Sequence, residues 1–311
     1  MTGKNATEML RADEAGIARA SAILREGGLV ALPTETVYGL GARADSEEAV
    51  ARIYEAKGRP SFNPLIVHVG SLEAGENLAE FGEEARALAA AHWPGPLTLV
   101  LPRLPQAGLA TGVTAGLTSI ALRCPAHPVM QAVLAAAKVP LAAPSANRSG
   151  SVSPTSAEHV LTTLEGRIDA VLDAGECPTG LESTIIAVRK DGSIDELRPG
   201  PITVVPRNFR PEPAKVEAPG QLASHYSPGK PMRLNASEVA PDDFVIGFGE
   251  MEGHCTLSAS GNLTEAASRL YACLHEAARS DKPRIAIAPV PNAGIGRAIN
   301  DRLRRAATPA D

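Results

Sequence analysis

Short apolar runs alternate with stretches of helical spacing along most of this 311-residue chain, and this alternation restricts the possible folds more than any other feature. Residues 29–32 are typical of the runs, because they are apolar and Pro33 follows, as at the end of a short buried strand. Residues 10–26 are typical of the helical stretches, because their apolar residues recur on one face and Gly27 follows. Alternating strands and helices favour an α/β layer structure.

The predicted elements before residue 199 are as follows. Strands are expected at 29–32, 64–69, 97–101, 119–123, 139–143, 170–173, 184–188 and 194–198. Helices are expected at 10–26, 125–138 and 155–164, with Ala-rich helical stretches up to residue 92 and a helix capped by Asp45 or Ser46 that ends near residue 56.

A proline-rich stretch interrupts this pattern. Residues 199–231 contain eight prolines and almost no periodicity, which is typical of a linker. Strand and helix patterns then return at 244–248, 263–278, 284–288 and 295–306. We therefore predict an α/β domain over residues 1–206, a linker over 207–231 and a small α/β domain over 232–311.

The composition argues against several classes of protein. The formal net charge is −5 and aromatic residues make up 3%, so the chain lacks the basic balance and the stacking residues of a tight nucleic-acid binder. The sequence contains no run of about 18 apolar residues, which a membrane-spanning helix would need. The polar first ten residues lack the pattern of a signal peptide, so we expect a cytoplasmic protein without membrane association.

The cysteine pattern gives no sign of a metal site. Cys124, Cys177, Cys255 and Cys273 are far apart and form no Cys-x-x-Cys pair. We therefore expect buried free thiols rather than a zinc site or a disulfide framework. The sequence also contains no Gly-x-x-x-x-Gly-Lys, Gly-x-Ser-x-Gly or His-Glu-x-x-His motif, which argues against the usual nucleotide-loop, hydrolase and metalloprotease chemistries.

Polar clusters follow several predicted strands, where open α/β sheets bind ligands. Lys57-Gly58-Arg59 places two cations on one short loop. A helix C-terminus favours cations without any ligand, but a phosphate chain between the two charges is the alternative explanation. Residues 143–154 are rich in small and hydroxyl residues, which is typical of a loop whose backbone N–H groups approach an anion.

Three further residues have two interpretations each. Arg123 ends an apolar strand and needs a carboxylate, either from a substrate or from another side chain. His68 lies within an apolar run, where a core role is the more common one. Tyr226 either anchors the proline-rich stretch or closes over a pocket. Because no nucleophile–base–orienter triad stands out, these clusters favour a site that positions polyanions and stabilises charge.

Together the clusters resemble the threonylcarbamoyl-AMP synthase family, in its longer form with an extra C-terminal domain. The resemblance rests on motifs in the family's order, namely P-T-E-T-V-Y-G-L (33–40), Lys57-Gly58-Arg59, Ser145-Ala146-Asn147, G-L-E-S-T-I (180–185) and H-Y-S-P (225–228). It continues through P-N-A-G-I-G-R-A-I-N-D-R-L (291–303), so nearly the whole chain is covered. It implies a YrdC-like twisted mixed sheet with helices, followed by a small Rossmann-like α/β domain.

The resemblance also implies an activity: L-threonine, bicarbonate or CO2, and ATP give threonylcarbamoyl-AMP and pyrophosphate, with Mg2+ accompanying ATP. The product would be used by separate transfer proteins that make threonylcarbamoyladenosine in tRNA. The implied ATP contacts are Arg59, Asn63, Ser119, Ser145, Ser153, Arg198 and Tyr226. The implied threonine contacts are Thr36, His68, Arg123, Ser183 and the backbone of Ala143. The implied catalytic residues around the phosphates are Lys57, Arg59, Ser145 and Asn147.

Two other functions stay open on the sequence. A YrdC-like module is associated with double-stranded RNA, so a tRNA-binding module is one alternative, although the acidic balance weighs against it. A carbamoyl-transfer enzyme is the other, because hydrogenase-maturation carbamoyltransferases contain a similar module. Those enzymes also carry zinc-finger-like Cys motifs and an acylphosphatase segment, and this sequence has neither.

Overall fold

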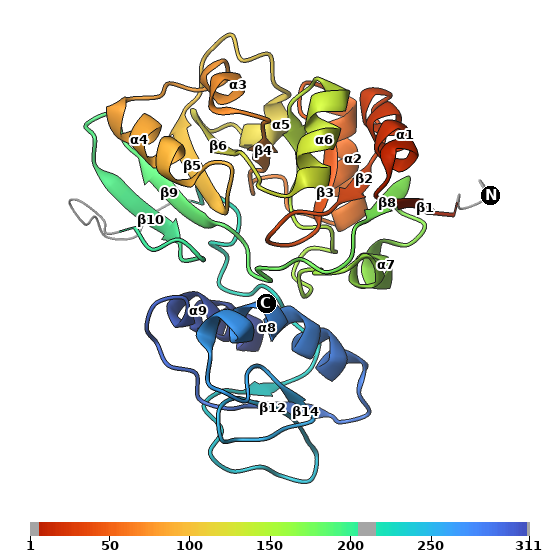
Figure 1. Cartoon of the computed structure of the whole chain (residues 1–311), viewed down its shortest axis with the longest axis vertical. Helices are drawn as coiled ribbons and strands as arrows, with labels where there is room; N and C mark the ends of the chain where they lie inside the picture. The colour runs from red at the N-terminus through yellow and green to blue at the C-terminus, as the bar shows by residue number, and fades with distance from the viewer. Residues whose placement is uncertain (1–5, 205–215, 310–311) are drawn as a thin grey trace.

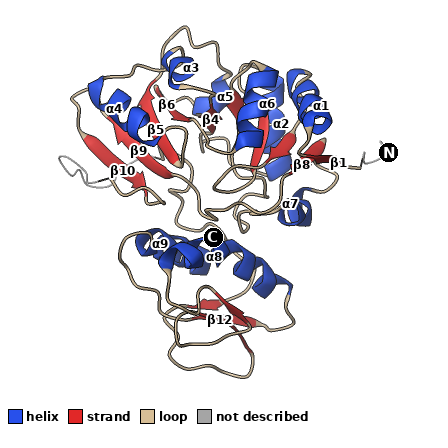
Figure 2. Ribbon diagram, in the orientation of Figure 1, coloured by secondary structure: helices blue, strands red, loops and turns tan. Residues whose placement is uncertain are grey.

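The computed structural model describes residues 6–204 and 216–309, which form two sheets with their helices (Figure 1, Figure 2). The larger sheet has ten strands in the order β1-β8-β2-β3-β7-β4-β6-β5-β9-β10 and mixes parallel with antiparallel pairs. Its strands are β1 Glu8–Arg11, β2 Val30–Leu32, β3 Gly39–Arg43, β4 Ile66–His68, β5 Leu97–Pro102, β6 Ser119–Arg123, β7 Leu141–Ala142, β8 Ala170–Asp173, β9 Thr184–Val188 and β10 Ile194–Arg198. Its helices are α1 Glu14–Arg25, α2 Glu47–Lys57, α3 Leu72–Glu76, α4 Glu83–His92, α5 Thr111–Thr114, α6 Pro128–Ala137 and α7 Ala157–Leu164.

Different elements cover the two faces of the ten-stranded sheet. Ala31 of β2 packs in the cluster that contains residues of α2, α4 and α7, whereas its neighbours Val30 and Leu32 pack with residues of α1 and α6. Farther along this second face, Ile66 packs in a cluster with Ala218, which belongs to the segment between the two sheets. The sheet therefore has helices at one end of this face and an irregular segment at the other.

His68 and Arg123 lie on this second face because of strand periodicity. Successive side chains of a strand point to opposite faces, so His68 shares the face of Ile66, and Arg123 shares the face of Ala121. The strands β4 and β6 are parallel and place His68 directly beside Arg123. A run of apolar residues therefore carries two polar side chains away from the core and toward the irregular segment.

The structure confirms the predicted strands at 119–123, 170–173, 184–188 and 194–198 at the same residues. The predicted helix over 10–26 is wrong at its start, because Glu8–Arg11 forms β1 beside β8 and the helix begins at Glu14. The cap residue Asp13 fixes this start, since its side chain accepts a hydrogen bond of 2.8 Å from the backbone N–H of Gly16.

The strand β3 was not predicted from the sequence. Gly39–Arg43 has few of the β-branched and aromatic residues that favour strands, so no local signal marks it. Its glycines serve packing instead: a Cβ atom on Gly41 would lie 2.9 Å from Leu32 Cδ1 in the neighbouring strand. Only the sheet around it makes this segment a strand.

The smaller sheet has four parallel strands in the order β11-β14-β12-β13, and we call it with its helices the C-terminal domain. Its elements are β11 Met232–Arg233, β12 Asp243–Gly247, β13 Cys255–Thr256, α8 Leu263–Arg279, β14 Arg284–Ile287 and α9 Gly296–Ala307. Figure 1 shows α8 and α9 between this sheet and the ten-stranded part. Apolar residues of both parts share one core cluster there, among them Leu181 and Leu270.

The segment between the two sheets is only partly described. Of the predicted linker, residues 207–215 lie outside the described residues, and so does the predicted boundary at 206. Residues 216–231, which we call the connecting segment, contain no helix or strand and run between the two parts of the molecule.

The cysteine prediction is half wrong. Cys124 and Cys177 are buried free thiols, as expected. Cys255 and Cys273 instead form a disulfide, with Cα atoms 5.8 Å apart. Their separation of 18 residues gave no hint of this, because the pairing depends on how α8 packs beside β13. Within the described ranges, no helix is long and apolar enough to cross a membrane.

Candidate active site

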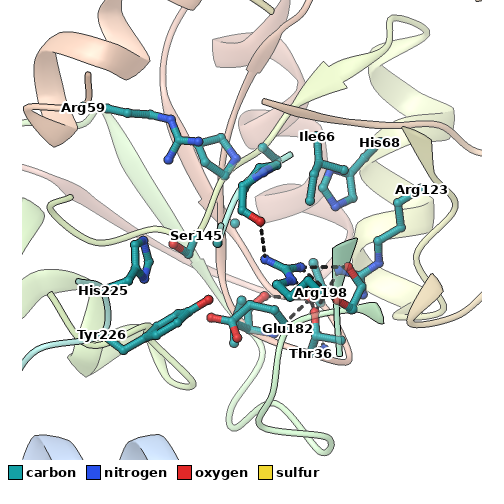
Figure 3. A pocket seen from close by; sticks show the side chains of 18 residues that line it. Thr36, Arg59, Ile66, His68, Arg123, Ser145, Glu182, Arg198, His225 and Tyr226 are labelled. Carbon is teal, nitrogen blue, oxygen red and sulfur yellow. Dashed lines mark hydrogen bonds between the residues drawn. The ribbon is translucent and has the colours of Figure 1, made fainter. Parts of the chain in front are cut away.

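A pocket lies on the second face of the ten-stranded sheet, under the connecting segment (Figure 3). Loops after β2, α2 and β7 contribute to it, together with β4, the end of β6, the two residues before β9, the end of β10 and the connecting segment. Nine of the residues singled out in the sequence line this pocket, namely Thr36, Arg59, His68, Arg123, Ala143, Ser145, Ser183, Arg198 and Tyr226. The tertiary structure thus brings together residues from five separate motifs.

Arg59 stands at one side of the pocket, on the loop that ends α2. Gly58 adopts a left-handed conformation with φ of 58°, which stops the helix and turns the chain. The Arg59 guanidinium donates to the Asn63 side-chain oxygen at 2.7 Å and to the Pro64 carbonyl at 2.7 Å. Burial lowers its pKa to about 10. Because these acceptors are neutral oxygens, the cationic charge of Arg59 can still attract an anion.

Arg198, the last residue of β10, is the second buried cation in the pocket. Its Nη2 donates to the Ser183 carbonyl at 2.9 Å, and its Nη1 donates to the Pro219 carbonyl of the connecting segment at 3.4 Å. Gly220 next to it has φ of +84°, and a Cβ atom there would lie 2.8 Å from Arg198 Cδ. Glycine is therefore needed for the connecting segment to approach this cation so closely.

Arg123 reaches the pocket from the side opposite Arg59 in Figure 3. Its Nη2 donates to Glu35 Oε1 at 2.6 Å, and its Nη1 donates to Thr36 Oγ1 at 2.9 Å. Both interpretations of Arg123 therefore keep support, because it forms an internal ion pair and also lines the pocket. Since a guanidinium has five N–H groups, Arg123 retains donors for a ligand carboxylate.

The His68 imidazole lies beside Arg123 and carries no charge at neutral pH. Burial, reinforced by the charge of Arg123, lowers the pKa of His68 to about 3. Its Nδ1 is buried and has no hydrogen-bond partner among the described residues. The same holds for His225 Nδ1 and the Tyr226 hydroxyl, which also lie in residues that line the pocket. Buried polar atoms without partners are costly, so this pocket is prepared for a polar ligand.

The structure does not place every predicted residue in the pocket wall. The Lys57 amine donates instead to the backbone carbonyls of Ser145, at 2.6 Å, and of Asn147. Burial holds the pKa of Lys57 well below its usual value. Lys57 therefore holds the shape of the Ser145–Asn147 loop, and that loop presents Ser145 to the pocket.

The other residues outside the wall have different positions. The Asn63 side chain accepts from Arg59, and Asn147 donates to the Arg148 and Ser151 carbonyls of its own loop. Ser119 begins β6 opposite Pro102. Ser153 donates to Glu182 at 2.6 Å, so it lies one contact behind the pocket.

Glu182 is a buried pocket residue that was not singled out from the sequence. It lines the pocket, and its Oε2 accepts from the Tyr271 hydroxyl at 2.7 Å and from Arg302 Nε at 2.9 Å. Burial by itself would raise the pKa of this carboxyl, but Arg302 and Arg198 lower it to about 2. The carboxylate inside G-L-E-S-T-I was a usable signal. Nothing local pointed to Tyr271 and Arg302, because they come from α8 and α9.

Comparisons with known proteins agree with this architecture. A family profile described as "Telomere recombination" matches residues 22–200, and one described as "Threonylcarbamoyl-AMP synthase, C-terminal domain" matches residues 183–308. The threonylcarbamoyl-AMP synthase of Bacillus subtilis is 38% identical, over 97% of this chain and 95% of its own length. The threonylcarbamoyl-AMP synthase of Pyrococcus abyssi is also 38% identical, over 95% of this chain and 95% of its own length.

Solved structures give the same result. The structure of Pyrococcus abyssi Sua5 complexed with L-threonine matches with a TM-score of 0.87 and 36% identity, over 97% of both chains. Escherichia coli YciO matches with a TM-score of 0.51 and 21% identity, over 60% of this chain and 91% of its own, and shares the fold only. On these matches, which span both domains, the chain belongs to the threonylcarbamoyl-AMP synthase family, in the form that carries the C-terminal domain.

Proposed function

We propose that this protein is an L-threonylcarbamoyladenylate synthase, a nucleotidyltransferase that acts in tRNA modification. The threonine amine adds to CO2 and loses a proton, which gives a carbamate. A carbamate oxygen then attacks the α-phosphorus of ATP, and the bond from that phosphorus to the bridging oxygen of the leaving pyrophosphate breaks. The products are threonylcarbamoyl-AMP and pyrophosphate.

The observation that carries the proposal is the arrangement of charge in the pocket. Arg123, with neutral His68 beside it, stands on one side, and Arg59 and Arg198 supply two more buried cations. A small ligand with a carboxylate fits the first part, and a phosphate chain fits the second. Holding both ligands in one pocket places a carbamate next to the α-phosphate, which replaces a collision in solution.

In this proposal the cations also stabilise the reaction. Negative charge moves onto the departing pyrophosphate as the bond breaks, and a buried guanidinium stabilises that charge more than water does. Thr36, Ser183 and the Ala143 backbone would complete the threonine site. Ser145, on the loop that Lys57 holds, would contact the phosphates together with Arg59.

Mg2+ belongs in this proposal to the substrate, as MgATP, because phosphate oxygens and water supply the oxygen ligands that it prefers. The described part of the chain contains no group of three His, Cys, Asp or Glu side chains that could hold a metal ion. Bicarbonate would supply the CO2, and separate transfer proteins in the cytoplasm would consume the product.

The test measures pyrophosphate release from ATP with L-threonine and bicarbonate both present, and then with each omitted. We expect release that depends on both, and a product with the mass of threonylcarbamoyl-AMP. Pyrophosphate release that is unaffected by omission of threonine would exclude the proposal. L-serine serves as a control substrate, because it has the same carboxylate and amine but lacks the methyl group of threonine.

A further inference from the structure

A buried ionic cluster joins the C-terminal domain to the wall of the pocket. Arg302 of α9 is completely buried, with an exposed fraction of 0%. Its Nε donates to Glu182 Oε2 at 2.9 Å, its Nη1 donates to Asp301 at 2.7 Å, and its Nη2 donates to the Pro199 carbonyl at 3.0 Å. A guanidinium with its three nitrogens bonded to separate partners has a fixed orientation.

The same guanidinium contacts the connecting segment. Arg302 Cζ lies 5.4 Å from the centre of the Tyr226 ring, which is within the range of a cation–π interaction. Tyr226 has φ of +64°, a left-handed conformation that is strained for a bulky residue and persists only when its surroundings enforce it. The Tyr226 ring also stacks with the ring of Tyr271 on α8, with the ring centres 5.7 Å apart.

The end of α9 holds the backbone on either side of Tyr226. Arg305 Nη1 donates to the Leu222 carbonyl at 2.6 Å, and the N–H of His225 donates to the Arg305 carbonyl at 3.1 Å. The Ser224 hydroxyl donates to the Thr308 carbonyl at 2.9 Å. Residues 222–226 are therefore tied to α9 rather than to the ten-stranded part alone.

A close approach of α8 supports the same arrangement. Gly180, two residues before Glu182, has φ of +68°, and a Cβ atom on it would lie 2.4 Å from the Ser268 carbonyl oxygen of α8. Only glycine lets α8 contact the loop at this distance. This contact brings the Tyr271 hydroxyl to Glu182, and His275 Nε2 to the Ser153 carbonyl at 3.1 Å.

We infer that Arg302 is a positioning residue of the active site, which acts from the C-terminal domain by holding Glu182 and Tyr226 in the arrangement that binds ATP. This inference rests on the proposed function. Glu182 in turn holds Ser153 and lies near Arg198, so the ATP contacts implied by the resemblance on this side of the pocket meet at the Glu182–Arg302 pair. Arg123, on the threonine side, has no bond to this pair, because among the described residues it bonds only to Glu35, Thr36 and Gly95.

The test compares Arg302→Met with Arg297→Met in the full-length protein. Arg297 is also on α9 and forms an ion pair of 2.7 Å with Glu196 of the ten-stranded sheet. Unlike Glu182, Glu196 does not line the pocket. We expect Arg302→Met to raise the KM for ATP about tenfold or more while the Kd for threonine stays within about twofold. Arg297→Met should leave both within about twofold of the original protein. Equal ATP constants in the two variants would overturn the inference.

Arg302→Lys keeps the test valid if Arg302→Met does not fold. Lysine retains the charge beside Glu182, so the variant is expected to fold, but it lacks the planar group over Tyr226 and the donor to Pro199. We expect its KM for ATP to be about three- to tenfold higher than that of the original protein. A KM equal to that of the original protein would overturn the inference.

A second measurement is independent of catalysis. Amide hydrogen exchange in residues 219–229 should become faster in Arg302→Met and stay unchanged in Arg297→Met, because only the first variant releases Tyr226. Unchanged exchange in Arg302→Met would count against the positioning role even if the kinetics changed. If the unaltered protein releases no threonine-dependent pyrophosphate, the proposed function fails, and the exchange experiment still decides what Arg302 holds.

Discussion

At the scale of single residues, Arg123 combines an internal ion pair with a position in the pocket, where the proposed function gives it the threonine carboxylate to bind. Its ion pair with Glu35 is buried, so the pair orients the guanidinium before any ligand enters. Glu35 is itself fixed, since its Oε2 accepts from the Ala126 N–H at 3.0 Å. A ligand carboxylate then meets donors that are already aligned, which lowers the entropy cost of binding.

We predict that Arg123→Met weakens threonine binding by roughly 10- to 150-fold, the equivalent of a charge-assisted hydrogen bond of about 1.5–3 kcal/mol. Isothermal titration calorimetry measures this directly. The double variant Arg123→Met/Glu35→Gln is measured as well, because it removes the carboxylate that the single variant leaves buried without a partner. Arg86→Met, which alters an exposed ion pair with Glu76, is the control. Threonine affinity that is unchanged in a folded Arg123→Met protein contradicts the assignment.

Lys57 lies behind the pocket wall rather than in it. Its amine supports two backbone carbonyls of the Ser145–Asn147 loop. Lys57→Met should lower the free energy of unfolding by about 2–3 kcal/mol, because the carbonyls lose their buried donor. It should also reduce kcat, since Ser145 is no longer held in place. Urea denaturation and the pyrophosphate assay test the two effects, and a variant with normal stability would show that the loop does not depend on Lys57.

At the scale of elements, the disulfide between β13 and α8 stabilises the C-terminal domain. It closes a loop with a sequence separation of 18 residues, for which loop-entropy arguments give about 3 kcal/mol. We predict that Cys273→Ala, or reduction by dithiothreitol, lowers the free energy of unfolding by about that amount. Cys124→Ala provides the control for the loss of a buried thiol. Equal stability of the reduced and oxidised proteins would contradict the prediction.

At the scale of the whole molecule, the two parts meet through stacked imidazoles. The rings of His159 on α7 and His275 on α8 lie 3.9 Å apart and nearly parallel, at 14°. Burial and the charge of Arg279 lower the pKa of His159 to about 4. Burial, followed by the charges of His159 and Arg279, lowers the pKa of His275 to about 3. Both rings are therefore neutral at neutral pH, and protonation would place two positive charges in contact within the interface.

This interface predicts a dependence of stability on pH. An unfolded histidine takes up a proton near pH 6.5, whereas His159 and His275 in the folded protein do so only near 4 and 3. The unfolded state thus binds more protons below pH 6.5, and stability falls as the pH decreases from 6.5 toward 4, by up to about 1.4 kcal/mol per pH unit for each histidine. Denaturation between pH 8 and pH 5 measures the slope.

The variant His275→Gln should flatten this slope, because it removes one of the buried imidazoles and keeps a donor for the Ser153 carbonyl. His92→Gln is a matched control on α4, outside the interface. If the two variants have the same pH dependence, the buried pair does not control acid stability.

The sequence by itself determined the α/β class, most strands of the central sheet, and the motifs that meet at the pocket. It did so because periodicity and turn residues are local, and because motifs such as Lys57-Gly58-Arg59 keep their spacing in any conformation. The tertiary structure alone decided which of those residues face the pocket. Lys57 turned to the backbone, while Glu182 acquired Tyr271 and Arg302 from helices that follow it by 89 and 120 residues. The tertiary structure also determined that residues 39–43 form β3 and that Cys255 bonds to Cys273, because both depend on neighbours across the fold. Contacts between distant segments leave no local trace in residue order, so only the packed molecule shows them.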